Sequence, residues 1–381
     1  MSKASANAPA ALKSVGTASA VALIVAHCAG MIDLVALPVW VGALVDRFGF
    51  TPQQAGGLAT LFLLGAVAAS AIFAPRFTRM NQRLVATLGF AIAAAAFFAA
   101  ATQSAFGPLA GLHLLAGFAT GSALSMIHGT IGHSTNPHRL FAMAGIALGL
   151  FGIIFMGAVP QILIAQGGAA LFTTFGVVMA VAAIATALLL RNPAGVHEFA
   201  ATRWRRSVWL VIIGVSLMTF NQAMVFSFVE VIGGTHGFTH EAVLGVLIAI
   251  GVVNFLIPAP LAAILEKRLD AHGVTIAGPL VQAILALIVT MVAVFPVWAV
   301  AASVFVGVQI FTHTFAFGLL ARLDPTGRAV AATPAMLMIG AALGPVVGGT
   351  LGQTLGFGAL GIAAVIVAAV SVGFFAKASR A

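Results

Sequence analysis

The residues best suited to chemistry lie in the first long apolar segment, Val21–Leu44. Asp33 stands near its middle, and His27 stands six residues earlier. A run of roughly 20 apolar residues can cross a membrane as a helix. A carboxylate at that depth is costly, and proteins keep one mainly where it faces protein, a cavity or an ion path. Because an apolar environment favours the neutral acid, Asp33 is a candidate to bind and release a proton near neutral pH.

Three interpretations of Asp33 stay open. It could exchange the coupling proton, it could be the counter-charge for a cationic substrate, or it could accept a hydrogen bond that joins two helices. An asparagine would serve the third role at lower cost. The sequence therefore favours a functional role for Asp33.

Other strongly polar side chains fall within later apolar segments and could share a cavity with Asp33. Histidine ionises nearest physiological pH, but a buried neutral histidine bonded to a backbone carbonyl is the structural alternative. Glu230, near the end of its segment, could simply be solvated. The candidates for proton coupling or a substrate cavity are His27, Asp33, His113, His128, Asn221, Gln222, Glu230, Gln309 and His313.

Metal and nucleotide chemistry find little support. His27 and Met31 share a helix face, and soft ligands of these types suit copper. However, the 12 methionines are an ordinary number for so hydrophobic a chain and serve better as gap-fillers. Only one cysteine, Cys28, is present, and the chain contains neither GxxxxGK[ST] nor HExxH. We expect no metal site, no cofactor, no ATP-driven step and no enzyme activity.

The composition predicts what holds these residues. Of 381 residues, 61% are hydrophobic and 7% are charged, against about 25% charged in soluble domains. The pattern predicts an all-α polytopic membrane protein with twelve transmembrane helices. The expected spans are about 18–45, 53–74, 84–104, 107–131, 140–165, 168–190, 207–232, 241–265, 274–295, 297–320, 329–353 and 354–376.

Loop charges agree with this count. If the N-terminus is cytoplasmic, 16 of the 17 Lys and Arg residues fall in cytoplasmic segments, and only Arg47 lies outside. We therefore expect a multi-pass protein of a bacterial-type inner membrane with both termini in the cytoplasm. The net charge of +9 reflects this orientation, so nucleic acid is not an expected partner.

The basic segment between the sixth and seventh spans divides the chain into two weakly repeated halves. Asp33 and Asn221 hold corresponding places in the first helix of each half, 188 residues apart. We expect a cytoplasmic tail over 1–16, a six-helix bundle over 17–190, a linker over 191–206, a second bundle over 207–376 and a tail over 377–381. Such paired halves are a known transporter plan, with the site between them at mid-membrane.

Several stretches resemble motifs of the major facilitator superfamily. Ala74–Arg83 resembles its basic motif A, although Pro75 replaces the usual Asp. His113–Gly121 resembles motif B, with His113 in place of an Arg often tied to proton coupling. Gly344–Gly349 matches the GPxxGG core of motif C. That core lies on the eleventh helix, whereas family antiporters carry it on the fifth, so the antiporter signature is not met.

The resemblance covers all twelve spans and implies two pseudo-symmetric six-helix halves. It also implies that helices 1, 4, 7 and 10 line a central cavity, which is where most candidates lie. Small residues and prolines on the fourth, fifth, eighth and eleventh helices would allow close, adjustable helix packing, or serve a static bundle equally well. The structural or gating candidates are Arg76, Arg79, Gly117, Gly121, Gly344, Pro345, Gly348 and Gly349.

From these observations we expect a monomeric secondary transporter that moves a small organic solute by alternating access, coupled to protons. Efflux of a lipophilic or cationic compound is slightly favoured, and uptake of a small metabolite is the alternative. The lack of Lys or Arg deep in the spans argues against strongly anionic substrates. From another class, a non-transporting sensor or lipid-handling protein stays open.

Overall fold

The computed structural model of the chain describes residues 16–192, 204–324, 329 and 333–378, and every regular element in them is a helix. The first group comprises α1 (Thr17–Gly30), α2 (Ile32–Asp46), α3 (Pro52–Phe73), the 3-10 helix η1 (Ala74–Arg79), α4 (Gln82–Ala100), α5 (Phe106–Gly132), α6 (Pro137–Gln166) and α7 (Ala169–Leu189). The second comprises α8 (Arg206–Phe226), α9 (Val229–Thr235), α10 (His240–Leu256), α11 (Pro258–Leu265), α12 (Ala271–Met291), α13 (Phe295–Leu323), α15 (Thr333–Leu355) and α16 (Gly358–Ala378).

Twelve stretches of the described residues are long and apolar enough to cross a membrane, which confirms the predicted fold class. Three predicted spans are interrupted. The first breaks at Met31, the seventh ends at Phe226 and is followed by the short α9, and the eighth breaks at Ile257. Pro258 explains the last break, because it lacks an N–H and collides with the preceding turn. The predicted tails and linker lie partly outside the described residues.

Polar residues fix where several helices begin. The Thr51 hydroxyl accepts a hydrogen bond from the Gln54 backbone N–H, and the Gln54 side chain accepts one from Thr51. At the starts of α4 and α12, the Asn81 and Asp270 side chains accept hydrogen bonds from the backbone N–H groups of Leu84 and Gly273. Each cap satisfies an N–H that has no partner within the helix. The short loops and the capped starts therefore give each span a defined end.

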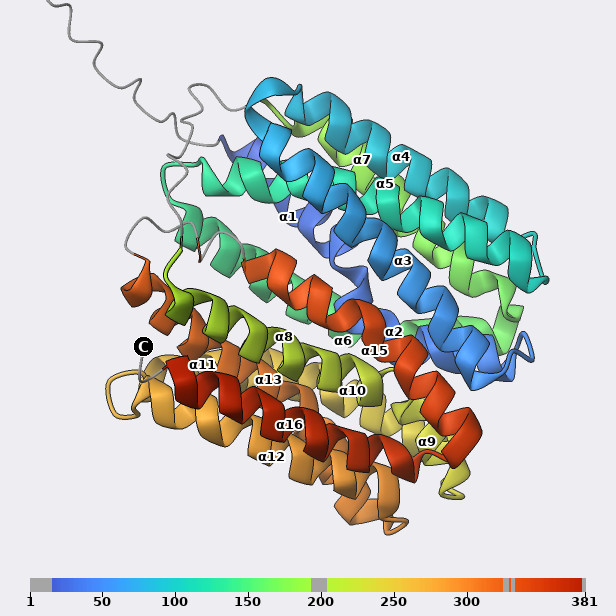
Figure 1. Cartoon of the computed structure of the whole chain (residues 1–381). Coiled ribbons are helices and arrows are strands. Elements are labelled where there is room, and N and C mark those ends of the chain that lie inside the picture. The colour runs from blue at the N-terminus through green and yellow to red at the C-terminus, as the bar shows by residue number, and fades with distance from the viewer. Residues whose placement is uncertain (1–15, 193–203, 325–328, 330–332, 379–381) are drawn as a thin grey trace, which may run out of the picture.

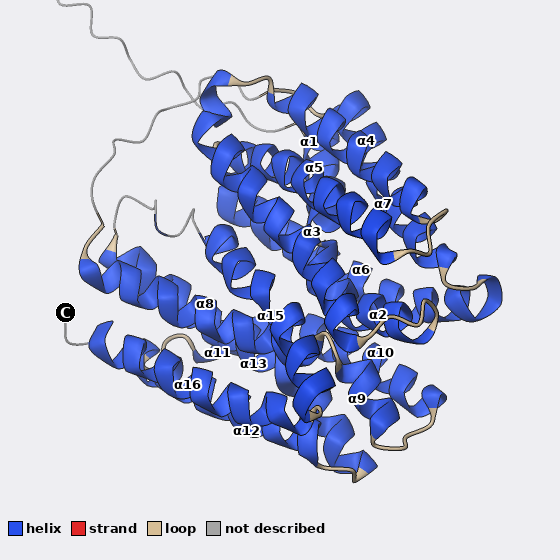
Figure 2. Ribbon diagram, turned by 45° about the vertical axis from the view of Figure 1, so that its right-hand side comes forward, coloured by secondary structure: helices blue, strands red, loops and turns tan. Residues whose placement is uncertain are grey.

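The helices form two groups that pack against each other (Figure 1). Helices α1 to α7, blue to green in Figure 1, pack mainly with one another, as do α8 to α16, yellow-green to red. We call these the N-group and the C-group. The end of the bundle where Thr17 begins α1 and Ala378 ends α16 is called the terminal end, and the other is called the far end. In Figure 2 the C label marks the terminal end, and α9 lies toward the far end.

The two groups join mainly through the pairs α3–α15, α6–α10 and α2–α9, with a smaller contact between α2 and α8. The α3–α15 contacts lie toward the far end, where Val346 donates its backbone N–H to the Thr60 hydroxyl at 3.1 Å and Gln53 donates to the Gln353 side chain at 3.3 Å. Toward the terminal end the C-group has an apolar core of its own, which includes Val208. The structure is thus joined at its far end.

Candidate functional site

Asp33 lies at an interruption of the first span. α1 ends at Gly30 and α2 begins at Ile32, with Met31 between them in a non-helical conformation (φ −105°, ψ 23°). Asp33 therefore stands in the first turn of α2, where a helix presents unpaired N–H groups and partial positive charge. The residue is 1% exposed, and its Oδ1 atom has no hydrogen-bond partner among the described residues. A buried acceptor without a partner requires an explanation.

The break beside Asp33 lies where the two groups meet. Met31 packs in a small apolar cluster with Ala66, Leu124 and Met338, and Met338 belongs to α15 of the C-group. A Cβ atom placed on Gly30 would lie 2.6 Å from Leu124 Cδ1, so α1 and α5 approach closely here. A movement between the groups would therefore change the surroundings of the break directly.

His27 and His128 form a pair across α1 and α5. The Nδ1 atom of His27 lies 3.0 Å from Nε2 of His128, and the ring centroids are 5.2 Å apart. One of these nitrogens must donate and the other accept, so the contact holds a single shared proton. Two sequence candidates are thus in direct contact, on the terminal side of the Met31 break.

His113 is surrounded by N-group residues. Its side chain is fully buried; Nδ1–H donates to the Leu109 carbonyl at 2.7 Å, and Nε2 accepts the Trp40 indole N–H at 3.3 Å. Both ring nitrogens have a partner, and these partners require the neutral tautomer with the hydrogen on Nδ1. This geometry favours the structural interpretation over a proton relay.

Several C-group candidates also bond within their own group. The Asn221 amide donates to the Ala364 carbonyl of α16 at 2.8 Å. Gln309 donates to the Thr219 hydroxyl at 3.0 Å and lies 3.4 Å from the Gln282 amide. These contacts join α8, α12, α13 and α16 to one another. They stabilise the C-group rather than present free groups to the N-group.

The two remaining C-group candidates have fewer defined partners. Gln222 is 8% exposed on α8. The His313 ring stacks on Phe317, with centroids 4.8 Å apart, and its Nδ1 atom has no hydrogen-bond partner within the described part of the chain.

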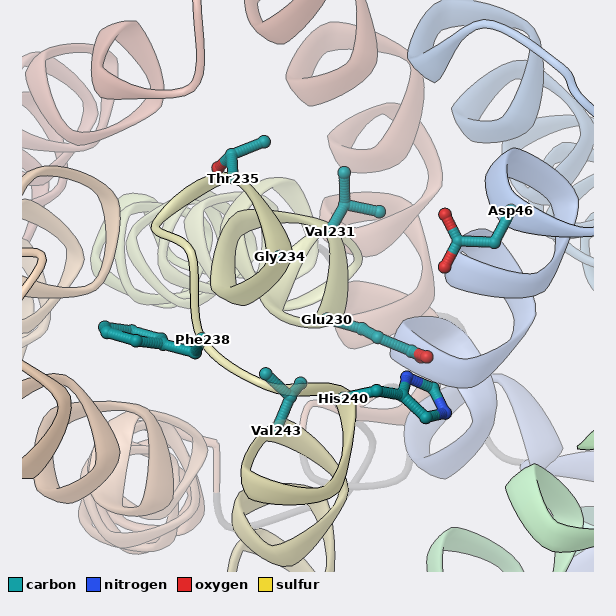
Figure 3. A pocket seen from close by; sticks show the side chains of 8 residues that line it. All are labelled: Asp46, Glu230, Val231, Gly234, Thr235, Phe238, His240 and Val243. Atoms are coloured by element: carbon teal, nitrogen blue, oxygen red, sulfur yellow. The ribbon is translucent and has the colours of Figure 1, made fainter.

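Glu230 lies apart from these, at the far end. It stands on α9, and its carboxyl lies against Gly42 of α2, so it crosses from the C-group to the N-group. Asp46 and His240 line the recess beside it (Figure 3). The described residues thus contain two unpartnered carboxyl oxygens at contacts between the groups, one on Asp33 and one on Glu230.

Comparison with known proteins identifies the fold family. A family model described as the Major Facilitator Superfamily matches residues 22–325, most of the chain. The chain belongs to the Major Facilitator Superfamily. No curated protein sequence matches the chain.

Solved structures of other superfamily transporters share the fold. A bacterial homolog of the human lysosomal transporter Spinster, in an inward-facing and occupied conformation, aligns with a TM-score of 0.74 and 14% identity over 95% of this chain and 96% of that one. Its unoccupied inward-facing form aligns at 0.71 with the same identity and coverage. The nucleoside transporter NupG, as a mutant, aligns at 0.72 with 12% identity over 94% and 99%. This chain is therefore a multi-pass membrane protein of a transporter superfamily.

The superfamily's glycine motifs lie at close helix contacts. Gly117 and Gly121 of α5 face the α3 backbone, where added Cβ atoms would lie 1.9 Å from the Phe62 carbonyl oxygen and 2.4 Å from that of Ala66. Both contacts are internal to the N-group, so these two glycines fix its packing.

The motif-C-like glycines of α15 serve both groups. Gly344 and Gly348 face α8 of the C-group, at Ala223 and Met224, whereas Gly349 faces the N-group: a Cβ there would lie 2.2 Å from the Pro52 carbonyl oxygen. A Cβ on Gly56 would lie 2.0 Å from the Pro345 carbonyl oxygen. Here α15 stands between the groups at backbone contact.

The motif-A-like arginines lie at the terminal end. Arg76, on η1, donates to the Ile72 carbonyl, and Arg79 is exposed. Phe77 between them stacks on His133 with centroids 4.9 Å apart, which packs η1 against the end of α5.

The Met31 break, Thr60 and the Trp40 contact were not among the sequence candidates. Gly30 was the only local sign of the break, and a helix breaker beside a membrane carboxylate could have indicated it.

Proposed function

We propose that this superfamily member is a proton-coupled secondary transporter and that Asp33 exchanges the coupling proton. The observation that carries the proposal is the unpartnered Asp33 Oδ1, buried at a helix break where the two groups meet. Discontinuous helices that expose polar backbone near mid-membrane are characteristic of transporter binding sites. A group at such a junction experiences a different environment in each conformation, which is what coupling requires.

Alternating access follows from the arrangement of contacts. The groups are joined toward the far end through α3–α15 and α2–α9, and α6–α10 contacts extend to Gly149 and Phe255, nearer the middle of the bundle. The C-group keeps a separate core toward the terminal end. We propose residues 17–190 and 207–376 as the two moving units, joined by the 191–206 linker. The charge distribution favours a cytoplasmic terminal end in a bacterial-type inner membrane, so the structure corresponds to a form closed to the outside.

The proposed substrate is a small lipophilic or cationic compound, and export is the favoured direction. A carboxylate can balance a cation, and the spans carry no Lys or Arg at depth to hold a strong anion. The Met31 cluster supplies apolar surface next to Asp33. The protein acts as a monomer in this proposal.

The test uses the purified protein in proteoliposomes with an acidic lumen and tetraphenylphosphonium as the lipophilic-cation probe. We expect Asp33→Asn to abolish gradient-driven accumulation, since it fixes a neutral side chain of the same shape. The matched control is Asp270→Asn, because Asp270 is exposed and its capping bond can be kept by asparagine. Wild-type accumulation by Asp33→Asn would move the coupling site to the His27–His128 pair. Absence of accumulation by the wild type would contradict cation efflux and favour metabolite uptake.

A further inference from the structure

Glu230 makes a direct contact between the two groups at the far end. It stands in the first turn of α9, and a Cβ atom added to Gly42 of α2 would lie only 2.5 Å from its Oε2 atom. The carboxyl therefore lies against the α2 backbone, in space that glycine alone leaves free. Oε2 is buried and has no hydrogen-bond partner among the described residues.

Charged and titratable side chains from the neighbouring elements lie near Glu230. At the end of α2 stand the Asp46 carboxylate and the Arg47 guanidinium, and His240 begins α10. The neighbouring part of α6 contributes Pro160 and Leu163, and the nearby end of α12 has no titratable side chain. On α9 itself, the following residue His236 packs edge-on to Phe238. The Glu230 and Asp46 carboxyls thus lie near each other, and Arg47 and His240 partly offset the repulsion between them.

This environment disfavours a charged Glu230. The residue lies beyond the α8 span, which ends at Phe226. Burial and, to a lesser degree, the Asp46 carboxylate raise the pKa of Glu230 to about 8, although Arg47 acts in the opposite direction. Neutral Glu230 is therefore the form that fits the closed contact.

The structure is hollowed next to the Glu230 contact. Two recesses, of about 290 and 280 Å³, lie at this contact, and both are lined by Asp46, Glu230 and His240. Figure 3 shows Glu230 and His240 extending toward α2, with Asp46 extending from α2 toward α9. The carboxyl is thus at the boundary between the joined groups and these recesses.

We propose that Glu230 is a second proton-binding site, separate from Asp33, whose protonation stabilises the joined far end. When the two groups separate at the far end, Glu230 becomes solvated and its pKa returns to the ordinary value for glutamate. The closed form then binds more protons than the open form, so by linkage it gains stability as the pH falls. Between the pKa of about 8 in the closed form and the ordinary 4.5, the closed-to-open ratio rises by up to about tenfold per pH unit. The inference rests on the proposed alternation of access but not on the role of Asp33.

The test measures far-end opening without substrate or gradient. In a Cys28→Ala background, spin labels at Gln53→Cys and Thr354→Cys report the separation of the α3 and α15 far ends, where both native residues are exposed. Over pH 5 to 8 we expect the parent protein to move from the short to the long separation, with at least a tenfold change in ratio. Glu230→Gln should keep the short separation throughout. The control Glu241→Gln, at an exposed residue of the α10 first turn, should behave as the parent.

A second variant guards against misfolding of Glu230→Gln. Gly42→Ala displaces the carboxyl from the contact, so the pH response should also disappear, now with the long separation favoured. A parent separation that ignores pH, or a Glu230→Gln protein that retains the parent response, overturns the proposal. Asp33→Asn should leave the distance response unchanged. Failure of the Asp33 transport test would therefore not affect this measurement, and the two proposals can be rejected independently.

Discussion

The backbone contact between Gly56 and Pro345 offers the sharpest test of how the two groups separate. An added Cβ on Gly56 would lie 2.0 Å from the Pro345 carbonyl oxygen, against 3.4 Å for an ordinary contact. The α3 backbone fixes the position of the Cβ, and the carbonyl oxygen belongs to the α15 backbone, so no side-chain rotation relieves the overlap. In Gly56→Ala, α3 and α15 must therefore move apart by about 1.4 Å, or the far end must open.

The size of the effect follows from what this movement removes. Overpacking at a close contact costs about 1–3 kcal/mol, and loss of the Val346–Thr60 hydrogen bond adds about 0.5–1.5 kcal/mol. Both penalties apply only to the joined far end. We therefore expect the closed-to-open ratio to fall by roughly 10- to 1000-fold, at 1.4 kcal/mol per factor of ten.

The assay is the distance between spin labels at Gln53→Cys and Thr354→Cys, measured at constant pH. The matched control is the neighbouring Gly57→Ala, because an added Cβ at Gly57 meets nothing within 4 Å. Both variants gain the same helix propensity, about 1 kcal/mol, so this gain cancels between them. Identical distance distributions for Gly56→Ala and Gly57→Ala would refute the role of this contact in far-end closure.

Three further predictions follow from contacts inside the N-group. His113→Gln should lower the free energy of unfolding by about 1–3 kcal/mol, since it disrupts two buried hydrogen bonds, and it should leave the pH profile of transport unchanged; a shifted profile would restore the proton relay. In a double-mutant cycle by thermal unfolding, His27→Gln and His128→Gln should show a coupling of about 0.5–3 kcal/mol, and additivity would contradict a hydrogen-bonded pair. Gly117→Ala should lower Tm without changing the far-end label distance, because its contact is internal to the N-group; a longer distance would contradict that assignment.

The sequence predicted the architecture because membrane burial constrains it strongly. The lengths of the apolar segments predicted the twelve spans, and the occurrence of Lys and Arg in alternate loops supported that count and the orientation. Pro258 also marked the interruption of the eighth span, which the structure places at Ile257. These signals depend on composition within a window, so they need no knowledge of neighbouring helices.

The sequence could not predict which polar residues meet. Asn221 and Asp33 hold corresponding places in the two halves, yet Asn221 bonds within the C-group while Asp33 Oδ1 has no partner among the residues that the structure describes. The difference depends on helix rotation and on the neighbouring helix, which hydropathy does not contain. The His27–His128 contact likewise joins residues 101 positions apart. Helix periodicity places each side chain on a face but does not identify the helix opposite.

The hydrogen bonds of the buried polar residues suggest where coupling occurs. His113 and Asn221 bond within one group, and such bonds persist when a group moves as a unit. Asp33 and Glu230 each carry an oxygen without a partner, and each lies where the groups meet. Only at such junctions does the environment of an acid change as the groups move, and a proton can shift a conformational equilibrium only through that difference. With Asp33 at the Met31 break and Glu230 at the far-end contact, proton binding at either residue would affect the same movement of the two groups.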